Sequence, residues 1–288
     1  MAYSVGLLLS EIAVRSSIEE VMINPLFWVG IAVMAASAAL LIVTNKYLRL
    51  CVLEILGVLT LRIVEPTVRH AWLFGVDPWW HYGLVEAIRG NNAVSIDDFL
   101  YPSKGSQVLM ANVADLLQID TLAVMRFFYI PFSIASGVLL FLISLRVFRS
   151  YRFACVSVLF LAVGQGTYIS LMPQTYGITL LLGVAYCTIR FLEHGRFQWA
   201  LGGALLSSSL LYTHYPCGFI LLMTFVVFAV FTLNARSPGR HAILTAFLAC
   251  SVLISLVVLI LYDAAFRRII SNIASEMLEA LIPSVALV

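Results

Sequence analysis

Runs of apolar residues as long as a bilayer is thick dominate this sequence. A helix needs about 17–25 mostly apolar residues to cross the hydrocarbon core of a membrane. We place about eight such runs, at residues 25–44, 49–65, 127–145, 153–172, 174–190, 198–213, 216–234 and 242–262. Only 11% of the residues are charged, against roughly a quarter in a soluble domain. The sequence therefore predicts an all-α fold, a polytopic bundle of transmembrane helices.

The few charges also limit the classes of partner. The formal net charge is +2, and no basic run or interleaving of basic and aromatic residues occurs, so we expect no nucleic-acid partner. The cysteines are isolated in apolar runs without metal-ligand spacing and are interpreted as small buried hydrophobes. They are Cys51, Cys155, Cys187, Cys217 and Cys250.

The segment 66–126 separates the second and third runs. It is too long for a connector and too apolar to be disordered, so it predicts one or two amphipathic helices lying in the membrane interface. The chain thus divides into an amphipathic N-terminal segment, 1–24, a transmembrane domain, 25–262, and an amphipathic tail, 263–288.

Lys and Arg concentrate in alternate loops, which predicts that these loops are cytoplasmic. They are Lys46, Arg49, Arg146, Arg149, Arg152, Arg190, Arg196, Arg236 and Arg240. The opposite loops, which include 66–126, 171–177 and 212–218, are then extracytoplasmic. We therefore expect an integral protein of the cell membrane whose polar clusters, and any active site among them, face outward.

Two ionisable residues, Glu54 and Arg62, lie inside the second run. They are eight positions apart and so share one helix face. Charged groups at membrane depth are costly unless they face the bundle interior. We expect these two residues to serve helix packing rather than catalysis.

The stretch "GVDPWWHYGLV", residues 75–85, places an acid and a histidine among aromatic residues. Asp77 is suited to cap a helix of about residues 78–89, Pro78 suits its first turn, and Gly90 suits its end. Asp77 and His81 are four apart and share a face of such a helix. The stretch is therefore either a capped interfacial anchor or part of a chemical site.

Three further segments follow on the predicted extracytoplasmic side: "YPSKGSQVLMA" (101–111), "LMPQTYG" (171–177) and "YTHYPCG" (212–218). Together with "DPWWH", Asp77 to His81, they resemble in order and sidedness the motifs of the GT-C glycosyltransferases. The resemblance is closest to the catalytic subunits of oligosaccharyltransferases and covers about residues 50–235.

The resemblance implies a membrane glycosyltransferase. Its donor is a sugar or glycan on a polyprenyl phosphate or polyprenyl diphosphate, and its acceptor is a protein, a glycan or a lipid. Asp77 is the implied catalytic residue, and a divalent cation, Mg²⁺ or Mn²⁺, is the implied cofactor. The implied metal ligands are Asp77, His81 and Gln174. The implied groups that bind the substrate or its phosphate are His81, Lys104, Arg126 and His214.

The sequence also departs from the family pattern. Gln174 stands where the family has an acid, and an amide offers a metal only a neutral carbonyl. Asp97 and Asp98 either replace that acid or form a solvated turn. The Trp-Trp-Asp acceptor motif and a C-terminal soluble domain are not found, so the chain is either a fragment of a longer enzyme or a compact family member.

Two alternatives to an enzyme remain. The chain could be a non-catalytic membrane subunit of GT-C fold, or a lipid-binding scaffold, that lost its acid at Gln174. A transporter fits less well, because ionisable residues are sparse within the predicted spans and no inverted repeat is visible.

Overall fold

The structure is a computed structural model that describes residues 2–16, 25–69, 76–90, 105–164 and 173–214, with single positions at 217, 218, 220, 221, 224, 271 and 275. All regular elements within these residues are α-helices. Three helical stretches among them are long and apolar enough to cross a membrane, Pro25–Thr44, Thr121–Phe148 and Thr175–His194. The described part of the chain is therefore all-helical, and these three helices indicate a membrane protein.

Six predicted runs coincide with helices. These are α2 (Pro25–Thr44), α3 (Leu48–Arg69), α8 (Tyr129–Phe148), α9 (Tyr151–Gly164), α10 (Pro173–His194) and α11 (Phe197–Thr213). The runs predicted at 216–234 and 242–262 lie outside the described residues, apart from single positions. Left-handed residues follow α2, α8 and α10, because Asn45, Arg149 and Gly195 have φ angles of 55°, 53° and 64°. Such residues end a helix and turn the chain sharply.

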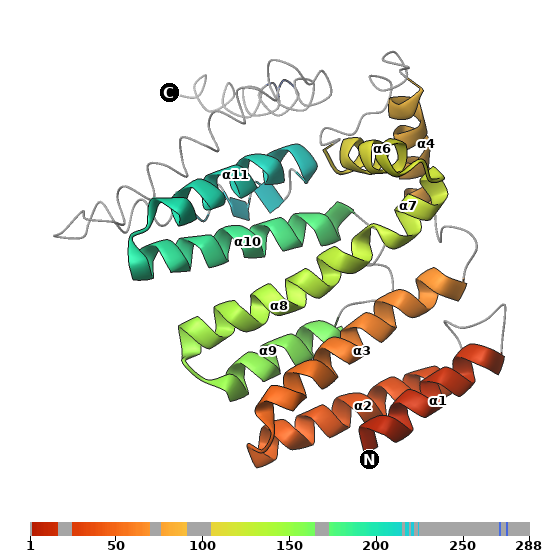
Figure 1. The fold of residues 1–288 in the computed structure, drawn as a ribbon, viewed down its shortest axis with the longest axis vertical. Coiled ribbons are helices and arrows are strands. Elements are labelled where there is room, and N and C mark those ends of the chain that lie inside the picture. Colours follow the sequence, from red (N-terminus) through yellow and green to blue (C-terminus); the bar gives the residue numbers. More distant parts are fainter. Residues whose placement is uncertain are drawn as a thin grey trace, which may run out of the picture.

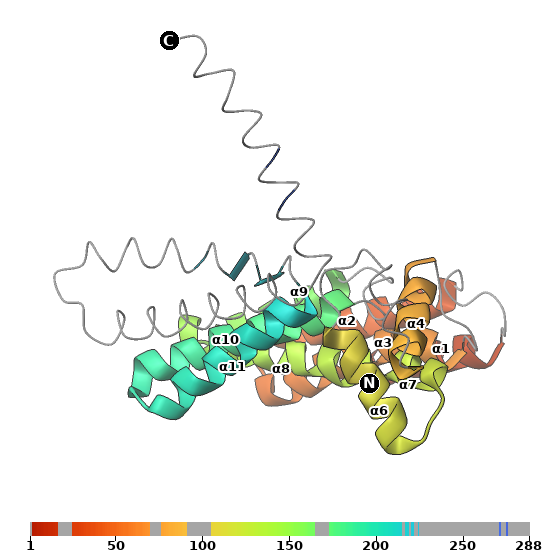
Figure 2. The same ribbon diagram turned by 90° about the horizontal axis from the view of Figure 1, so that it is seen from above.

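The long helices lie side by side in a flat row. Neighbours along the row are α2 with α3, α3 with α9, α9 with α8, α8 with α10, and α10 with α11 (Figure 1). Seen from above, the row is shallow, with α9 packed against α2, α3 and α8 (Figure 2). Two apolar clusters hold it together, one among α2, α3 and α9 around Met34 and Ile55, the other between α10 and α11 around Val184 and Leu210.

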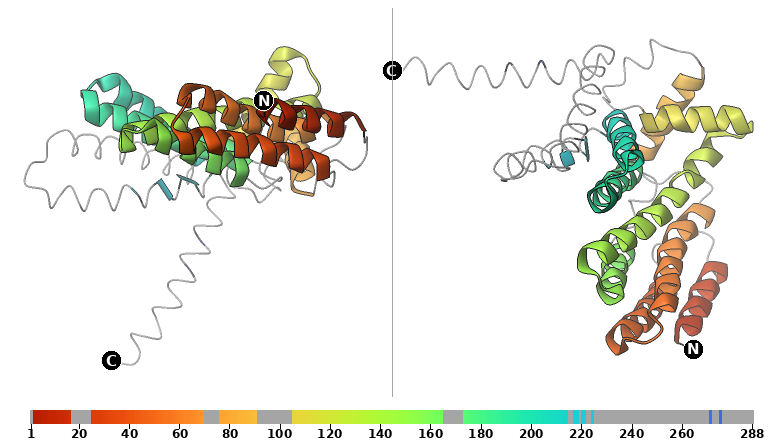
Figure 3. Two further views of the ribbon diagram at one scale, coloured as in Figure 1. Left: turned by 90° about the horizontal axis from the view of Figure 1, so that it is seen from below. Right: turned by 60° about the vertical axis from the view of Figure 1, so that its left-hand side comes forward.

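The N-terminal segment contributes α1 (Ala2–Ser16), which packs along α2 (Figure 3). The hydroxyl of Tyr3 donates to the backbone oxygen of Glu54 at 3.1 Å, which ties α1 to α3 as well. This first helix therefore belongs to the row of packed helices.

The segment 66–126 holds three described helices, α4 (Val76–Arg89), α6 (Gly105–Leu117) and α7 (Thr121–Phe127). They gather at one end of the row, where α4 stands across the direction of α3 and α8 (Figure 1). We call this the crossing end. The segment is therefore helical where it is described, with three helices instead of the expected one or two, and α3 also extends into it as far as Arg69. Their expected position in the membrane interface stays a prediction.

The expectation that Asp77 caps α4 is wrong in register. The helix begins at Val76, so Asp77 lies in its first turn. Pro78 is tolerated there because the first N–H groups of a helix have no partner within it. Gly90 follows the last helical residue as expected, and its N–H donates to the oxygen of Glu86 at 2.9 Å.

The basic turns gather at the opposite end of the row. The turns α2–α3, α8–α9 and α10–α11 all lie there, away from α4, α6 and α7 (Figure 1). The turns and the first residues of the helices that follow them carry Lys46, Arg49, Arg149, Arg152 and Arg196. We call this the basic end. Successive long helices run in opposite directions, so the basic loops that alternate along the sequence lie at one end of the row.

The expectation that Arg62 serves helix packing is confirmed. Its guanidinium donates to the backbone oxygens of Ala162 and Val163, the latter at 2.8 Å. It also lies 5.5 Å from the ring of Trp28. The last carbonyls of a helix lack partners within it, so Arg62 caps the described end of α9 from the side.

Candidate functional site

A buried hydrogen bond joins α4 to α6 at the crossing end. The Nδ1 atom of His81 lies 2.8 Å from the side-chain nitrogen of Gln107. The Gln107 oxygen accepts a hydrogen bond from the Ser106 hydroxyl at 2.9 Å. All three side chains are buried. Buried polar groups are costly unless they are paired, so these contacts fix how α4 crosses α6.

This arrangement sets the tautomer of His81. The Ser106 hydroxyl occupies the oxygen of the Gln107 amide, so the nitrogen of that amide faces Nδ1 and donates to it. A neutral His81 then carries its proton on Nε2. Nδ1 is therefore engaged within the protein, and the protonated Nε2 can donate a hydrogen bond but cannot bind a metal.

The N-terminus of α6 abuts the C-terminus of α11. A Cβ atom at Gly105 would lie 2.7 Å from the Thr213 Cγ2 atom and 2.9 Å from the Tyr212 backbone oxygen. Real Cβ atoms do not approach other atoms so closely, and therefore only glycine allows this contact between the two helices.

A second close approach joins α11 to α10. A Cβ atom at Gly177 would lie 2.7 Å from the Cβ atom of His214 and 3.0 Å from its Nδ1. The glycine near the start of α10 thus makes room for the histidine ring at the end of α11. Described residues of the segments 77–81, 101–111, 171–177 and 212–218 are thus joined in a chain of direct contacts.

His214 is the C-cap of α11. Its N–H donates to the oxygen of Leu210 at 2.8 Å, and its Nδ1 accepts from the N–H of Cys217 at 3.3 Å. The residue is only 6% exposed. Burial lowers the pKa of its imidazole, because removal from water disfavours the charged form. His214 thus favours the neutral state, with its proton on Nε2, and suits a hydrogen-bond donor better than a cation.

A partly exposed network of charged residues and one threonine fastens α4, α6 and α7 together. The Nε atom of Arg89 donates to Asp115 at 2.8 Å, and another guanidinium nitrogen donates to Thr121 at 2.5 Å. Thr121 donates in turn to Glu86. The hydrogen bond to Asp115 raises the pKa of Arg89. Asp120 caps α7 by accepting from the N–H groups of Leu122 and Ala123.

Aromatic rings connect this end to the membrane-length helices. The ring centroid of Tyr176, near the start of α10, lies 4.5 Å from that of Phe132 and 6.0 Å from that of Phe128. Deeper in the row, the hydroxyls of Ser136 and Thr179 lie 2.7 Å apart. These contacts hold α8 and α10 parallel to each other beneath the crossing helices.

Several of the residues implied by the family resemblance therefore lie at the crossing end. His81 and His214 are buried in junctions between helices, and Arg126 lies in the last turn of α7, with its guanidinium 5.5 Å from the ring of Phe127. Asp77 and Gln174 lie in the first turns of α4 and α10, but their side chains are outside the described residues. Lys104, Asp97 and Asp98 lie outside them entirely.

Two of the three implied metal ligands, Asp77 and Gln174, have side chains outside the described residues. Within the described part of the chain, no three His, Cys, Asp or Glu side chains form a group suited to a metal ion. Of the implied ligands, His81 alone has a described side chain, and its Nδ1 is engaged by Gln107.

Sequence reasoning missed Gln107, although its pattern carried a signal. The buried face of α6 repeats at Gln107, Met110, Ala111 and Ala114, which is the three-and-four spacing of an apolar helix stripe. A glutamine in the first place of such a stripe is a buried amide that requires a partner. The sequence does not name that partner, since His81 comes from another helix.

No model of a known protein family matches the chain, and no curated protein matches it either.

Proposed function

We propose that this protein is a membrane glycosyltransferase of the GT-C type. It would move a sugar or glycan from a polyprenyl-phosphate or polyprenyl-diphosphate carrier to a protein, glycan or lipid acceptor, on the face formed by the crossing end. The observation that supports the proposal is the meeting of the four family-like segments. His81 bonds Gln107, Gly105 abuts Thr213, and His214 abuts Gly177.

The position of this junction gives a physical reason for a lipid-linked donor. It lies at the end of the row opposite the basic turns (Figure 1). Basic turns favour the cytoplasmic side, so the junction would face outward. Nucleotide sugars are cytosolic, and a transferase acting on the outer face therefore requires a donor delivered in the membrane.

The proposed reaction is a displacement at the anomeric carbon. The acceptor oxygen or nitrogen bonds to this carbon as the bond from the carbon to the phosphate oxygen breaks, and the lipid phosphate leaves with the bonding electron pair. Asp77 takes the proton from the acceptor as a general base. Whether the configuration inverts or is retained depends on the number of displacements.

The remaining residues would act on the leaving phosphate. Arg126 is placed at the junction of α7 and α8, where a guanidinium offers forked donors to a phosphate. His81 and His214 would each donate through Nε2, because their Nδ1 atoms accept hydrogen bonds inside the protein. Lys104 would add a second cation from the residue before α6.

A Mg²⁺ or Mn²⁺ ion, if one binds, would take oxygen ligands from Asp77 and Gln174 and would neutralise charge on the leaving phosphate. His81 does not fit as the third ligand, because its Nδ1 accepts from Gln107 and its Nε2 then carries the proton. No described group of side chains shows that this set is assembled.

The test compares two aspartates at the crossing end. The full chain is reconstituted in liposomes with radiolabelled polyprenyl-phosphate and polyprenyl-diphosphate sugars and with peptide, glycan and lipid acceptors. Asp77→Asn should lower transfer about 10²–10⁴-fold, the usual contribution of a general base. Asp120→Asn is the matched control, since asparagine also caps a helix, and it should transfer at the wild-type rate.

Equal transfer by wild type and Asp77→Asn would contradict the catalytic role. Donor binding without transfer in the wild type would favour the alternative, a non-catalytic subunit or lipid-binding scaffold of the same fold. Orientation is tested separately: a reporter fused after Arg149 should be cytoplasmic and one inserted near Asn91 extracytoplasmic. The reverse pattern would remove the argument for a lipid-linked donor.

A further inference from the structure

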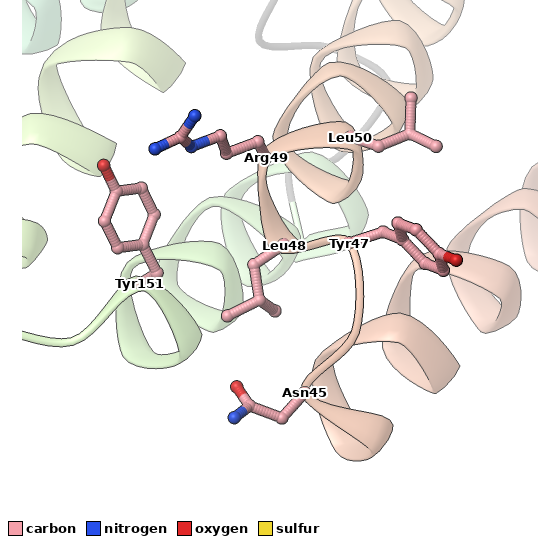
Figure 4. Close-up of a pocket in the computed structure, with 6 residues that line it drawn as sticks. All are labelled: Asn45, Tyr47, Leu48, Arg49, Leu50 and Tyr151. Atoms are coloured by element: carbon pink, nitrogen blue, oxygen red, sulfur yellow. The ribbon is translucent and has the colours of Figure 1, made fainter.

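A hollow lies at the basic end, away from the proposed active site. Its volume is about 590 Å³, and it opens between the α2–α3 turn and the start of α9. Figure 4 shows Asn45, Leu48 and Arg49 on the side that faces Tyr151, while Tyr47 and Leu50 extend the other way. The side of the hollow that faces Tyr151 thus carries both polar and apolar side chains.

Positive charge predominates around this hollow among the described residues. At the basic end, Glu193 already pairs with Arg146 at 3.3 Å, Arg190 at 3.2 Å and His194 at 3.6 Å. Among the described residues, no carboxylate lies within ion-pair distance of the cations on the two turns that flank the hollow. These cations are Lys46, Arg49, Arg149 and Arg152. A hollow with Arg49 in its wall and three further cations nearby attracts an anion.

The surroundings place the hollow at the level of lipid head groups. Tyr47 is 75% exposed and Tyr151 is 44% exposed, and exposed tyrosines mark the boundary between membrane and water. The apolar residues Leu50 and Leu53 next along α3 are 51% and 66% exposed, which suits contact with acyl chains. The hollow therefore meets the interface where Arg49 can reach a phosphate, while the leucines on the adjoining face of α3 can contact hydrocarbon.

We propose that this hollow binds the phosphate head group of an anionic phospholipid in the leaflet at the basic end. Arg49 is the principal contact to the phosphate, the Tyr151 hydroxyl and the Asn45 amide supply further hydrogen bonds, and Leu48 lies beneath the glycerol. Lys46, Arg149 and Arg152 favour an anionic lipid through the local potential, since each cation near an anionic surface contributes to such binding. The proposal does not depend on glycosyl transfer.

The experiment uses the full chain purified in a neutral detergent. Native mass spectrometry measures the binding of phosphatidylglycerol and of phosphatidylcholine with identical acyl chains. Wild type should bind phosphatidylglycerol about tenfold more tightly than phosphatidylcholine, and Arg49→Gln should weaken the phosphatidylglycerol complex by about tenfold, as expected when one charge-assisted hydrogen bond is lost. Tyr151→Phe, which removes a single hydroxyl, should weaken it by a smaller factor.

Arg196→Gln is the matched control, because Arg196 is an exposed arginine at the same end that does not line the hollow. It should leave lipid binding unchanged. Equal losses from Arg49→Gln and Arg196→Gln would overturn the proposal in favour of general attraction to the basic end. Equal affinity of the wild type for the two lipids would also overturn it, and this comparison requires no variant. Displacement of the lipid by millimolar inorganic phosphate would show an ion site instead.

Discussion

The chain turns in different ways at the two ends of the helix row. At the basic end, turns of two or three residues reverse the chain, and their charges stay exposed. At the crossing end, α4 stands across the row, α6 and α7 pack against it, and polar side chains are buried in the junctions. The basic end is thus organised by sequence-local features, and the crossing end by contacts between segments far apart in the chain. Substitutions should therefore be costly at the crossing end and mild at the basic end.

The largest effect on stability is expected at Gly177. Gly177→Ala would place a Cβ atom 2.7 Å from the Cβ atom of His214, and overpacking of this kind costs about 1–3 kcal/mol. The midpoint of thermal unfolding in detergent should fall. Gly202→Ala is the matched control, since the nearest atom to its new Cβ, the sulfur of Cys187, lies 3.5 Å away. A loss as large at Gly202 as at Gly177 would contradict the close approach.

The next effect is expected at the His81–Gln107 bond. Gln107→Leu leaves the His81 Nδ1 and the Ser106 hydroxyl buried without this partner, and each such group costs about 1–3 kcal/mol, partly offset by the added apolar burial. His81→Leu should also destabilise. The double variant removes both partners and should lose less stability than the two single variants together. Strict additivity would show that the two residues do not interact.

A smaller effect is expected from acid. Burial lowers the pKa of His214 below its ordinary value, which is about 6.5. As pH falls below about 6.5, the unfolded chain binds a proton at this position that the folded chain does not bind, so the stability of the fold decreases. The unfolding midpoint should fall less between pH 7.5 and pH 5.5 in His214→Asn than in the wild type. The variant keeps every other histidine. An unchanged pH dependence would therefore show that a group other than His214 causes the loss of stability in acid.

The smallest effect is expected at the basic end. Glu193→Gln removes the carboxylate shared by Arg146, Arg190 and His194, whose side chains are all partly exposed. Exposed ion pairs contribute about 0–1 kcal/mol and are screened by salt. The unfolding midpoint should therefore change little, and the change should shrink further at 0.5 M salt. A shift as large as that of Gly177→Ala would erase the contrast between the two ends.

Sequence alone predicted the long helices because their apolar runs end at clear signals. The helix α2 spans Pro25–Thr44 as expected, bounded by a proline at its first position and by the left-handed Asn45. The described part of α9 ends at Gly164, short of the expected 172. Gly164 and Gly166 are residues that often end helices, and positions 165–172 lie outside the described residues.

The junctions of the crossing end could not be predicted in the same way. Periodicity placed Asp77 and His81 on one helix, and α4 contains both. Periodicity does not say which helix meets which, so the pairing of His81 with Gln107 and the contact of His214 with Gly177 are results of tertiary packing. The roles of these residues in glycosyl transfer remain predictions.

The cap that Arg62 provides for α9 has a consequence for how the protein is made. Arg62 and its acceptor Ala162 are 100 residues apart, so α3 leaves the ribosome long before its partner carbonyls exist. An arginine at the centre of a helix opposes entry into the bilayer by about 2.5–3.5 kcal/mol. On the prediction that α3 crosses the membrane, we expect it to integrate poorly in nascent chains that stop before α9 and efficiently in chains that include it. Integration of this predicted span would then be a late event in biosynthesis.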